Sequence, residues 1–575
     1  MGIDHFECFN ATNQTSLRLR RHLTFAQPLV PDSCERIVFL DRQDRCKYAN
    51  TNPSCLSQVF LFNYNAIFYC KCDADDLLGL ACTVWLLLEC VLIFWVIYFT
   101  TIHYFVPALT VIARMLNMNE YVAGETILTF GNNAPSIFSS VLGLKNKSRH
   151  GYSDTMSINL FMGVFATSLI MWVRPLAIDS SYFLRAMGFV LLYVTFVDFT
   201  IYFTRGYITI GWAVALSLIC PIYIAIVLID QCLQNRRDRA LSTSIRNTAE
   251  LDPEYITHVR TSSATNTVQR SANDKIFLQF FRSLDTLDRS RFSSPWAFCK
   301  LWALVKVVPM ILLRLFIPEI YTDQSAHSYS KLLMCIQITL TPTLTMAFIA
   351  EKFDKLSDRK VLVLMVCVVA LLPLSIAALF YSRTDTVPRW YKSMEALNLM
   401  GCLLVLFVMT KELNCLLEAV GIIVKRSHTF IGCTLYTWGS GWSDLLLNLS
   451  LARRGLPRMA FSACYGSIIF SIFSSVCIPY LFSAIEPSPT GNNYVTKGTV
   501  GDTASTFLII SLGLTILYAV STNFMLRRTG ALVGITMYVL FLIFCVLTEF
   551  EVIHAYGTDH TKDHDHYDES YSTRV

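Results

Sequence analysis

Two short polar stretches lie inside segments that are otherwise apolar enough to cross a bilayer. The first is FGNNAPSIFSS, residues 130–140, with two consecutive asparagines, a proline and three serines. The second is TWGSGWSDLLLN, residues 437–448, with two glycines, two serines and the acidic residue Asp444. Short oxygen-bearing side chains and interrupted helices at mid-membrane can replace the water shell of a cation. These residue types therefore favour ion binding over catalysis.

The two stretches form an internal repeat that begins at Thr126 and Thr434. The alignment pairs Gly131 with Gly439, Asn132 with Ser440, Asn133 with Gly441 and Ser136 with Asp444. Glycine, serine and proline also allow membrane helices to pack closely, and for either copy alone we weigh packing and ion binding equally. Two polar copies in register, one of them with a costly acidic residue, favour an ion site.

The composition is that of a polytopic membrane protein. Hydrophobic residues make up 54% and charged residues 15% of the chain, and the mean hydropathy is +0.46. The net charge of +5 is modest and falls in loops, so we expect the lipid bilayer and transported cations as partners and exclude nucleic acid. No Walker-type glycine loop is present, so we expect no enzymatic activity and no cofactor, and an ion gradient as the energy source.

Reading about 20 residues per span predicts twelve membrane helices. They are expected near 77–103, 121–144, 157–178, 181–203, 207–231, 328–350, 359–382, 394–416, 429–452, 458–483, 504–525 and 530–551. Residues 296–316 are more typical of an interfacial helix, because three basic residues interrupt the apolar run. Each repeat copy is the second helix of a five-span group, and two spans separate the groups, so the groups are inverted in the membrane. We expect an all-α polytopic fold of two inverted five-helix repeats plus about two extra helices.

Six segments follow from this reading. They are a cysteine-containing non-cytosolic segment (1–76), the first five-helix repeat (77–231), a basic loop with the interfacial helix (232–327), two extra membrane helices (328–393), the second five-helix repeat (394–551) and a His/Asp-rich tail (552–575). The tail composition favours a solvated segment over a metal site.

The amino-terminal segment suits an oxidising compartment. Its two sequons make Asn10 and Asn13 candidate glycosylation sites. We expect at least one disulfide among Cys34, Cys46, Cys55 and Cys70, while the sequence leaves the connectivity open. The location is expected to be the mitochondrial inner membrane or the plasma membrane.

Several charged residues lie in or near the predicted spans without an expected transport role. Glu125 is expected to face water at a membrane boundary, with a place on the access path as the alternative. Glu412 and Glu418 are expected to be solvated at the end of a span, with a place at the entrance of the transport pathway as the alternative. The remaining four are expected to reach the interface or to pair with one another: Arg174, Arg185, Asp198 and Asp230.

The sequence around both repeats resembles the cation/calcium exchanger superfamily, and within it the mitochondrial sodium/calcium exchanger branch. The resemblance rests on VAGETILTFGNNAPSIFSS (122–140), LARRGLPRMAFSACYGSIIFSI (451–472) and DRCKYANTNPSC (44–55), and it covers most of residues 45–551. It implies a fold of ten core helices in two inverted bundles and exchange of sodium for calcium. It also implies an ion-binding set of Asn132, Asn133, Ser136, Asn159, Ser440, Asp444, Ser467 and Ser471.

One departure from the family pattern bears on the transported ion. Relatives carry an acidic residue where this chain has Ser136, which leaves Asp444 as the principal charged ligand. Calcium prefers six to eight oxygen ligands and several negative charges. The expected function is a secondary-active antiporter that exchanges sodium and calcium by alternating access. The alternatives are a monovalent-cation exchanger, with lithium as a further ion, a proton-coupled exchanger, or a transport-inactive regulatory relative.

Overall fold

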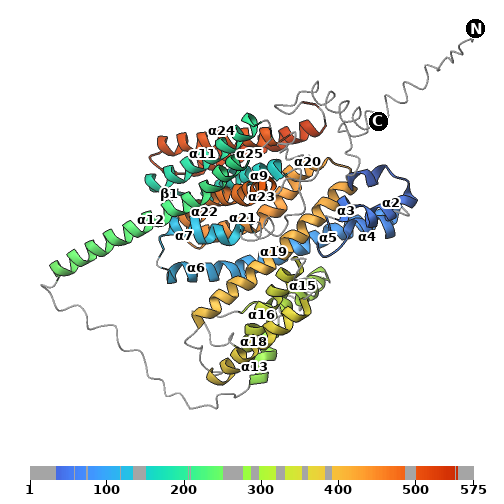
Figure 1. Ribbon diagram of the computed structural model, residues 1–575, viewed down its shortest axis with the longest axis horizontal. Coiled ribbons are helices and arrows are strands. Elements are labelled where there is room, and N and C mark those ends of the chain that lie inside the picture. Colours follow the sequence, from blue (N-terminus) through green and yellow to red (C-terminus); the bar gives the residue numbers. More distant parts are fainter. Residues whose placement is uncertain are drawn as a thin grey trace, which may run out of the picture.

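The computed structural model is built almost entirely of helices (Figure 1). It describes residues 34–56, 58–72, 76–116, 118–133, 137, 151–204, 206, 209–249, 276–285, 297–318, 330–352, 360–382, 391–485, 500–550 and 552–553. The predicted glycosylation sites, Ser136 and nearly all of the His/Asp-rich tail lie outside these residues.

Five helices and a short strand make up the described part of the first repeat. The first helix is continuous through α5 (Asp76–Thr100), a π-helical turn (Thr101–Phe105) and α6 (Val106–Met115). The second comprises α7 (Glu120–Ala123), a π-helical turn (Gly124–Leu128) and further helical residues to 133. The remaining elements are α9 (Gly151–Leu160), a π-helical turn (Phe161–Ala166), α10 (Thr167–Val173), β1 (Leu176–Ala177), α11 (Ser180–Phe203) and α12 (Ile210–Ala249).

The second repeat has the same order of five helices, but its strand lies between the fourth and fifth helices, whereas β1 lies between the third and fourth. It begins with α19 (Tyr391–Ile423), and its second helix comprises α20 (His428–Ile431), a π-helical turn (Gly432–Tyr436) and α21 (Thr437–Arg453). The remaining elements are α22 (Pro457–Ile472), a π-helical turn (Phe473–Cys477), α23 (Ile478–Ile485), α24 (Gly501–Ser521), β2 (Met525–Leu526) and α25 (Arg528–Glu549).

Ten helices of the described chain are long and apolar enough to cross a membrane, and all ten coincide with predicted spans. The two predicted spans that are not among them, 121–144 and 429–452, are those that carry the polar repeats. Their oxygen-bearing residues lower the hydropathy, and part of the first lies outside the described residues. The two repeat helices are therefore the least lipid-like of the predicted spans.

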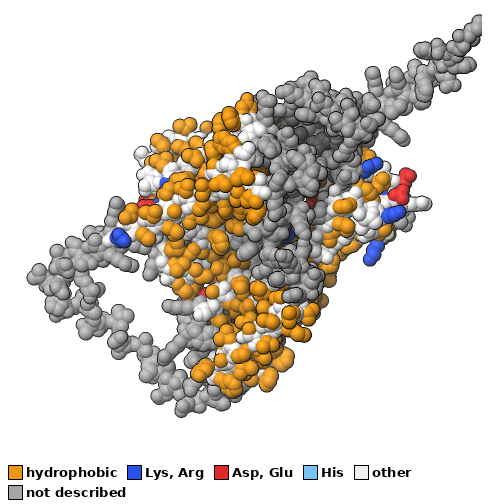
Figure 2. All heavy atoms as spheres, viewed as in Figure 1, with side chains coloured by type: hydrophobic (Ala, Val, Ile, Leu, Met, Phe, Trp, Pro, Cys, Tyr) orange, Lys and Arg blue, Asp and Glu red, His pale blue; other side chains and the backbone are white. Residues whose placement is uncertain are grey.

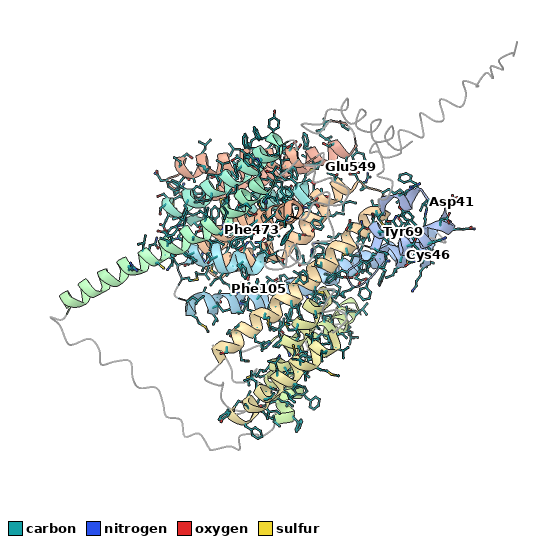
Figure 3. All side chains as sticks on the ribbon, in the orientation of Figure 1. Asp41, Cys46, Tyr69, Phe105, Phe473 and Glu549 are labelled. Carbon is teal, nitrogen blue, oxygen red and sulfur yellow. A yellow bond between two sulfur atoms is a disulfide. The ribbon has the colours of Figure 1, made fainter. Side chains whose placement is uncertain are left out.

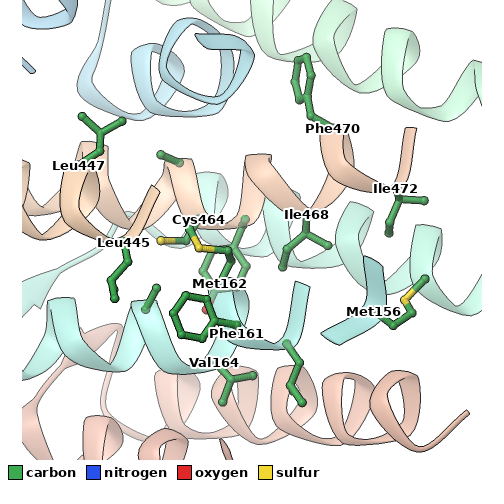
Figure 4. Close-up of a cluster of buried hydrophobic side chains, with 14 of the residues drawn as sticks. Met156, Phe161, Met162, Val164, Leu445, Leu447, Cys464, Ile468, Phe470 and Ile472 are labelled. Carbon is green, nitrogen blue, oxygen red and sulfur yellow. The ribbon is translucent and has the colours of Figure 1, made fainter. Parts of the chain in front are cut away.

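The two repeats pack into each other. The helix α22 of the second repeat contacts the π-helical turn at Gly124–Leu128, and α9 of the first repeat contacts the corresponding turn at Gly432–Tyr436. Figure 4 shows apolar side chains between them, including Phe161 of the first repeat and Ile468 of the second. One shared core therefore holds the polar repeat helices at its centre.

The outer helices present apolar side chains outward, as a bilayer requires. On α18 (Lys360–Tyr381), Val369 is 70% exposed and Phe380 is 79% exposed. Figure 2 shows hydrophobic side chains covering most of the described surface of the visible face.

Four auxiliary helices lie together beside α19 (Figure 1). They are α13 (Ile276–Leu284), α15 (Ala297–Phe316), α16 (Lys331–Lys352) and α18. Of these, α16 contacts both α18 and α19.

The cysteine-containing segment folds into a small helical module against the core (Figure 3). It comprises a 3-10 helix (Cys34–Phe39), α2 (Arg42–Thr51), α3 (Pro53–Leu56) and α4 (Tyr64–Lys71). Disulfides join Cys34 to Cys55, Cys46 to Cys70 and Cys72 to Cys82. The expected disulfide among the first four of these cysteines is confirmed, and the link from Cys72 to α5 is additional.

The module attaches to α19 through two carboxylates that the sequence places in water. Glu412 is 3% exposed and accepts hydrogen bonds from the Leu61 backbone at 3.0 Å and the Tyr64 hydroxyl at 2.7 Å. Glu418 accepts one from Gln58 at 2.7 Å. Burial, together with the hydrogen bond to the Glu412 carboxylate, raises the pKa of Tyr64, so its hydroxyl remains a hydrogen-bond donor. The expectation of a solvated helix end is wrong for Glu412, because α19 continues to Ile423 and the module covers this stretch.

The opposite end of the core carries basic residues. Arg458 donates to the Ala177 carbonyl at 3.0 Å and Arg528 to the Trp172 carbonyl at 3.2 Å. The strands β1 and β2 pair antiparallel beside them. Since α25 runs from Arg528 to Glu549, and Glu549 accepts a hydrogen bond from the Ser427 backbone just beyond α19, this end lies away from the disulfide module.

Candidate functional site: a cation site between the repeats

Matching π-helical turns interrupt both repeat helices. They begin at Gly124 and Gly432, which are separated by the same 308 positions as the aligned threonines. The hydroxyl of Thr129 donates to the Gly124 carbonyl at 2.7 Å, and that of Thr437 donates to the Gly432 carbonyl at 2.9 Å. A π-helical turn inserts an extra residue and leaves backbone groups unpaired, and it is frequent at functional sites. The repeat therefore extends to backbone geometry.

The sequence places the interruption too far along the second copy. It predicts a break at the polar residues themselves, whereas α21 is a continuous helix from Thr437 to Arg453. The distortion occurs earlier, at Gly432–Tyr436. The polar side chains of the second copy consequently project from regular helix.

Each turn packs a glycine against the helix that follows the other copy. A Cβ on Gly124 would lie 2.1 Å from the Ser462 hydroxyl oxygen and 2.4 Å from the Met459 carbonyl oxygen. A Cβ on Gly432 would lie 2.2 Å from Oδ1 of Asp154. Ser462 and Asp154 are again 308 positions apart, so both halves of the contact obey the same symmetry.

A line of hydrogen bonds joins the two repeats at the predicted residues. Nδ2 of Asn133 donates to the Ser467 hydroxyl at 3.1 Å, and this hydroxyl donates to Oδ2 of Asp444 at 3.4 Å. The neighbouring Ser443 hydroxyl donates to Oδ1 of Asp444 at 3.4 Å. The structure thus brings a carboxylate, two hydroxyls and an amide from both repeats together.

The other predicted residues lie around this line. The amide nitrogens of Asn132 and Asn159 are buried without a hydrogen-bond partner in the described part of the protein. Ser440 accepts a hydrogen bond from Asn414 at 2.8 Å. Ser471 is buried one turn beyond Ser467, and its carbonyl accepts the Ser474 hydroxyl at 3.2 Å.

Glu125 does not face water, contrary to the prediction. It is 1% exposed and pairs with Arg185 at 2.8 Å, and Arg185 also pairs with Asp230 at 2.6 Å. Inward-facing Arg185 neutralises Glu125, which removes this carboxylate as a free cation ligand. The expectation that Arg185 and Asp230 pair with other charges is confirmed. Asp198 accepts hydrogen bonds from Tyr152 at 2.6 Å and Ser505 at 3.2 Å.

One known family model matches both five-helix groups. The model named "Sodium/calcium exchanger protein" matches residues 85–229 and 394–548, which together make up more than half of the chain. The chain belongs to this sodium/calcium exchanger family.

Individual members show the same similarity over nearly the whole length. This exchanger is 28% identical to the mitochondrial sodium/calcium exchanger protein of Mus musculus, over 95% of this chain and 96% of that protein. It is 24% identical to cation/calcium exchanger 2 of Arabidopsis thaliana, over 88% of each chain. A solved structure of the sodium-calcium exchanger NCX_Mj covers 80% of this chain and 97% of that one, with 13% identity and a TM-score of 0.41.

Three polar residues near the line of hydrogen bonds were not among the predicted site residues of this exchanger. Asn448 is fully buried one turn beyond Asp444, and its Oδ1 has no hydrogen-bond partner in the described structure. Asp154 lies against Gly432, and Asn414 contacts Ser440. Extending the 308-position offset of the repeat beyond the polar stretches pairs Asp154 with Ser462, and this pairing could have marked Asp154 from the sequence. No sequence signal of comparable strength marks Asn414, because it lies on a different helix.

Proposed function

We propose that this exchanger is an antiporter of sodium and calcium that works by alternating access, with one cation-binding region between the repeats. The observation that carries the proposal is the hydrogen-bonded line from Asn133 through Ser467 to Asp444. It joins the second helix of one repeat to the second and third helices of the other. A bound ion here would contact both halves, so relative movement of the halves would change its access.

The proposed ligands are oxygen atoms, as hard cations require. From the second repeat they come from Ser440 and Asp444, which are one turn apart on α21, and from Ser467 and Ser471 on α22. The buried Oδ1 of Asn448 extends the same face of α21 by one more turn. From the first repeat they come from Asn132, Asn133 and Asn159, together with Ser136 as the counterpart of Asp444.

Competition for a single carboxylate explains how exchange is coupled. An ionised Asp444 in a poorly hydrated site is costly without a cation, because a desolvated charge needs a partner. Either sodium or calcium supplies the positive charge, and both bind oxygen ligands. The halves would therefore change orientation with an ion bound, and one ion would leave before the other enters.

The same proposal extends to the segments and the location. The two five-helix groups form the transport core, the four auxiliary helices form an accessory bundle, and the disulfide module caps the non-cytosolic end. Disulfides persist in oxidising compartments. The relative from Mus musculus is a mitochondrial sodium/calcium exchanger protein, so we assign this protein to the mitochondrial inner membrane. We expect it to act as a transporter and to carry no enzymatic activity.

Transport by the purified full chain in calcium-loaded vesicles tests the function. Calcium efflux that depends on an inward sodium gradient supports the proposal. Movement of sodium or lithium without calcium would replace it with a monovalent exchanger, consistent with the single carboxylate at Asp444. A protein that is correctly folded but moves none of these ions would be a transport-inactive relative.

A further inference from the structure

The first helix of the second repeat places a polar side chain beside the proposed site. Asn414 on α19 is 7% exposed, and its Nδ2 donates to the hydroxyl oxygen of Ser440 at 2.8 Å. Ser440 is one helical turn, about 6 Å along the axis, from Asp444. The contact therefore lies within the reach of one ion and its ligands.

The other half of this amide has an unmet requirement. Oδ1 of Asn414 is buried and has no hydrogen-bond partner among the described residues. A Cβ on Gly439 would lie 2.8 Å from this oxygen, so only a glycine leaves it room. A buried acceptor without a donor costs about 1–3 kcal/mol. A cation would satisfy such an oxygen, since amide carbonyls are ordinary ligands of hard cations.

The first repeat has an apolar contact at the matching place. Gly131 is the counterpart of Gly439, and a Cβ there would meet the Phe105 ring at 3.3 Å and Leu109 at 3.9 Å. The second repeat keeps this apolar contact, since a Cβ on Gly439 would also meet two leucine side chains of α19, at 2.7 Å and 3.6 Å. Apolar side chains therefore make this packing contact in both halves, and the amide of Asn414 is additional to it.

The position of Asn414 is fixed from outside the membrane core. Two residues before it and four residues after it, Glu412 and Glu418 hold the disulfide module. These contacts restrain α19 on both sides of the amide. A ligand oxygen that is held before the ion arrives needs less ordering when it binds.

We propose that Asn414 is a ligand of the transported cation, with its Oδ1 coordinating the ion while its Nδ2 orients Ser440. This inference rests on the proposed exchange function and adds an oxygen from a helix outside the two polar repeats. A neutral ligand at this point keeps the site charge low. The low total charge of the site therefore helps to set the relative affinity for calcium and sodium.

The test compares Asn414→Asp and Asn414→Leu with a control on the same helix, Asn398→Leu. Asn398 is also buried, and it contacts Glu395 and Cys402 at the other end of α19. Calcium and sodium dependence of transport are measured with the full chain in vesicles. Asn414→Leu should raise the calcium KM about tenfold, the effect of losing one buried ligand. Asn414→Asp should lower the calcium KM and weaken inhibition by sodium, and Asn398→Leu should leave both constants unchanged.

A separate readout distinguishes this inference from the function itself. If the parent protein moves no calcium, stabilisation of the purified protein against heat by calcium or sodium is measured for the same variants. Loss of that stabilisation in Asn414→Leu alone supports the ligand, even though exchange is then rejected. Equal KM values, or equal stabilisation by ions, in Asn414→Leu, Asn414→Asp and Asn398→Leu would overturn the inference.

Discussion

The glycine contacts between the repeats predict that replacing a packed glycine by alanine destabilises the protein, whereas the same change at an unpacked glycine does not. In Gly124→Ala the new Cβ would lie 2.4 Å from the backbone oxygen of Met459. Ordinary contact then requires the two helices to separate by roughly 1 Å. Overpacking of this kind costs about 1–3 kcal/mol. Gly188 and Gly513 provide controls, because a Cβ on either meets no atom within 4 Å.

The second repeat gives the matching experiment with a different outcome. In Gly432→Ala the obstacle is the Asp154 side chain, with Oδ1 at 2.2 Å and Cγ at 3.0 Å. A side chain can be removed, so Asp154→Ala should relieve the overpacking in the double variant. Gly124→Ala should not be relieved by Ser462→Ala, since the Met459 backbone remains.

The measurement is a denaturant titration of the full chain in mild detergent, together with sodium-driven calcium efflux from vesicles. Gly188→Ala and Gly513→Ala should be neutral or stabilising by up to about 1 kcal/mol, the helix preference for alanine over glycine. Gly124→Ala should be destabilised and slow in transport. Overpacking between the repeats would be refuted if Gly124→Ala matched the two controls in both measurements, or if Asp154→Ala did not improve Gly432→Ala.

Three further outcomes are expected. Ser136→Asp should lower the calcium KM in vesicles, because it adds a second carboxylate at the counterpart of Asp444; an unchanged KM would show that site charge does not limit affinity. Arg185→Leu should destabilise the protein in detergent by about 3–5 kcal/mol, because it leaves buried Glu125 unpaired, and Glu125→Gln should restore part of the loss; equal stability of the parent and Arg185→Leu would contradict the buried pair. Peptide mapping without reductant should recover three pairs of cross-linked peptides, Cys34–Cys55, Cys46–Cys70 and Cys72–Cys82. Free thiols at these six cysteines would refute the disulfide module.

The sequence predicts the membrane helices well because apolar runs report directly on burial in lipid. It also locates the repeat, since the glycines and threonines that shape the π-helical turns recur at one spacing. The pairing of cysteines does not follow from sequence, because many connectivities satisfy the same spacing. Here the fold of the amino-terminal module decides it.

The surroundings of Glu125 and Asn414 could not be predicted from the sequence, because their hydrogen-bond and ion-pair partners lie on other helices. Glu125 near a predicted helix end is typical of a solvated residue, but Arg185, sixty positions later, lies beside it. Asn414 has no repeat partner or acidic character to mark it, and only the approach of α19 to Ser440 gives it significance. Both residues depend on tertiary contacts, which hydropathy and spacing do not encode.

Calcium binding to the purified protein tests the central claim most directly. Equilibrium binding of radiolabelled calcium is compared for the parent, Asp444→Asn and Glu395→Gln, a buried carboxylate on α19 that contacts Asn398 instead of the site. Removing the one carboxylate in the line between the repeats should abolish calcium binding that sodium can displace, and Glu395→Gln should retain it. Calcium binding of Asp444→Asn equal to that of the parent would show that the ion does not bind where the two repeats meet.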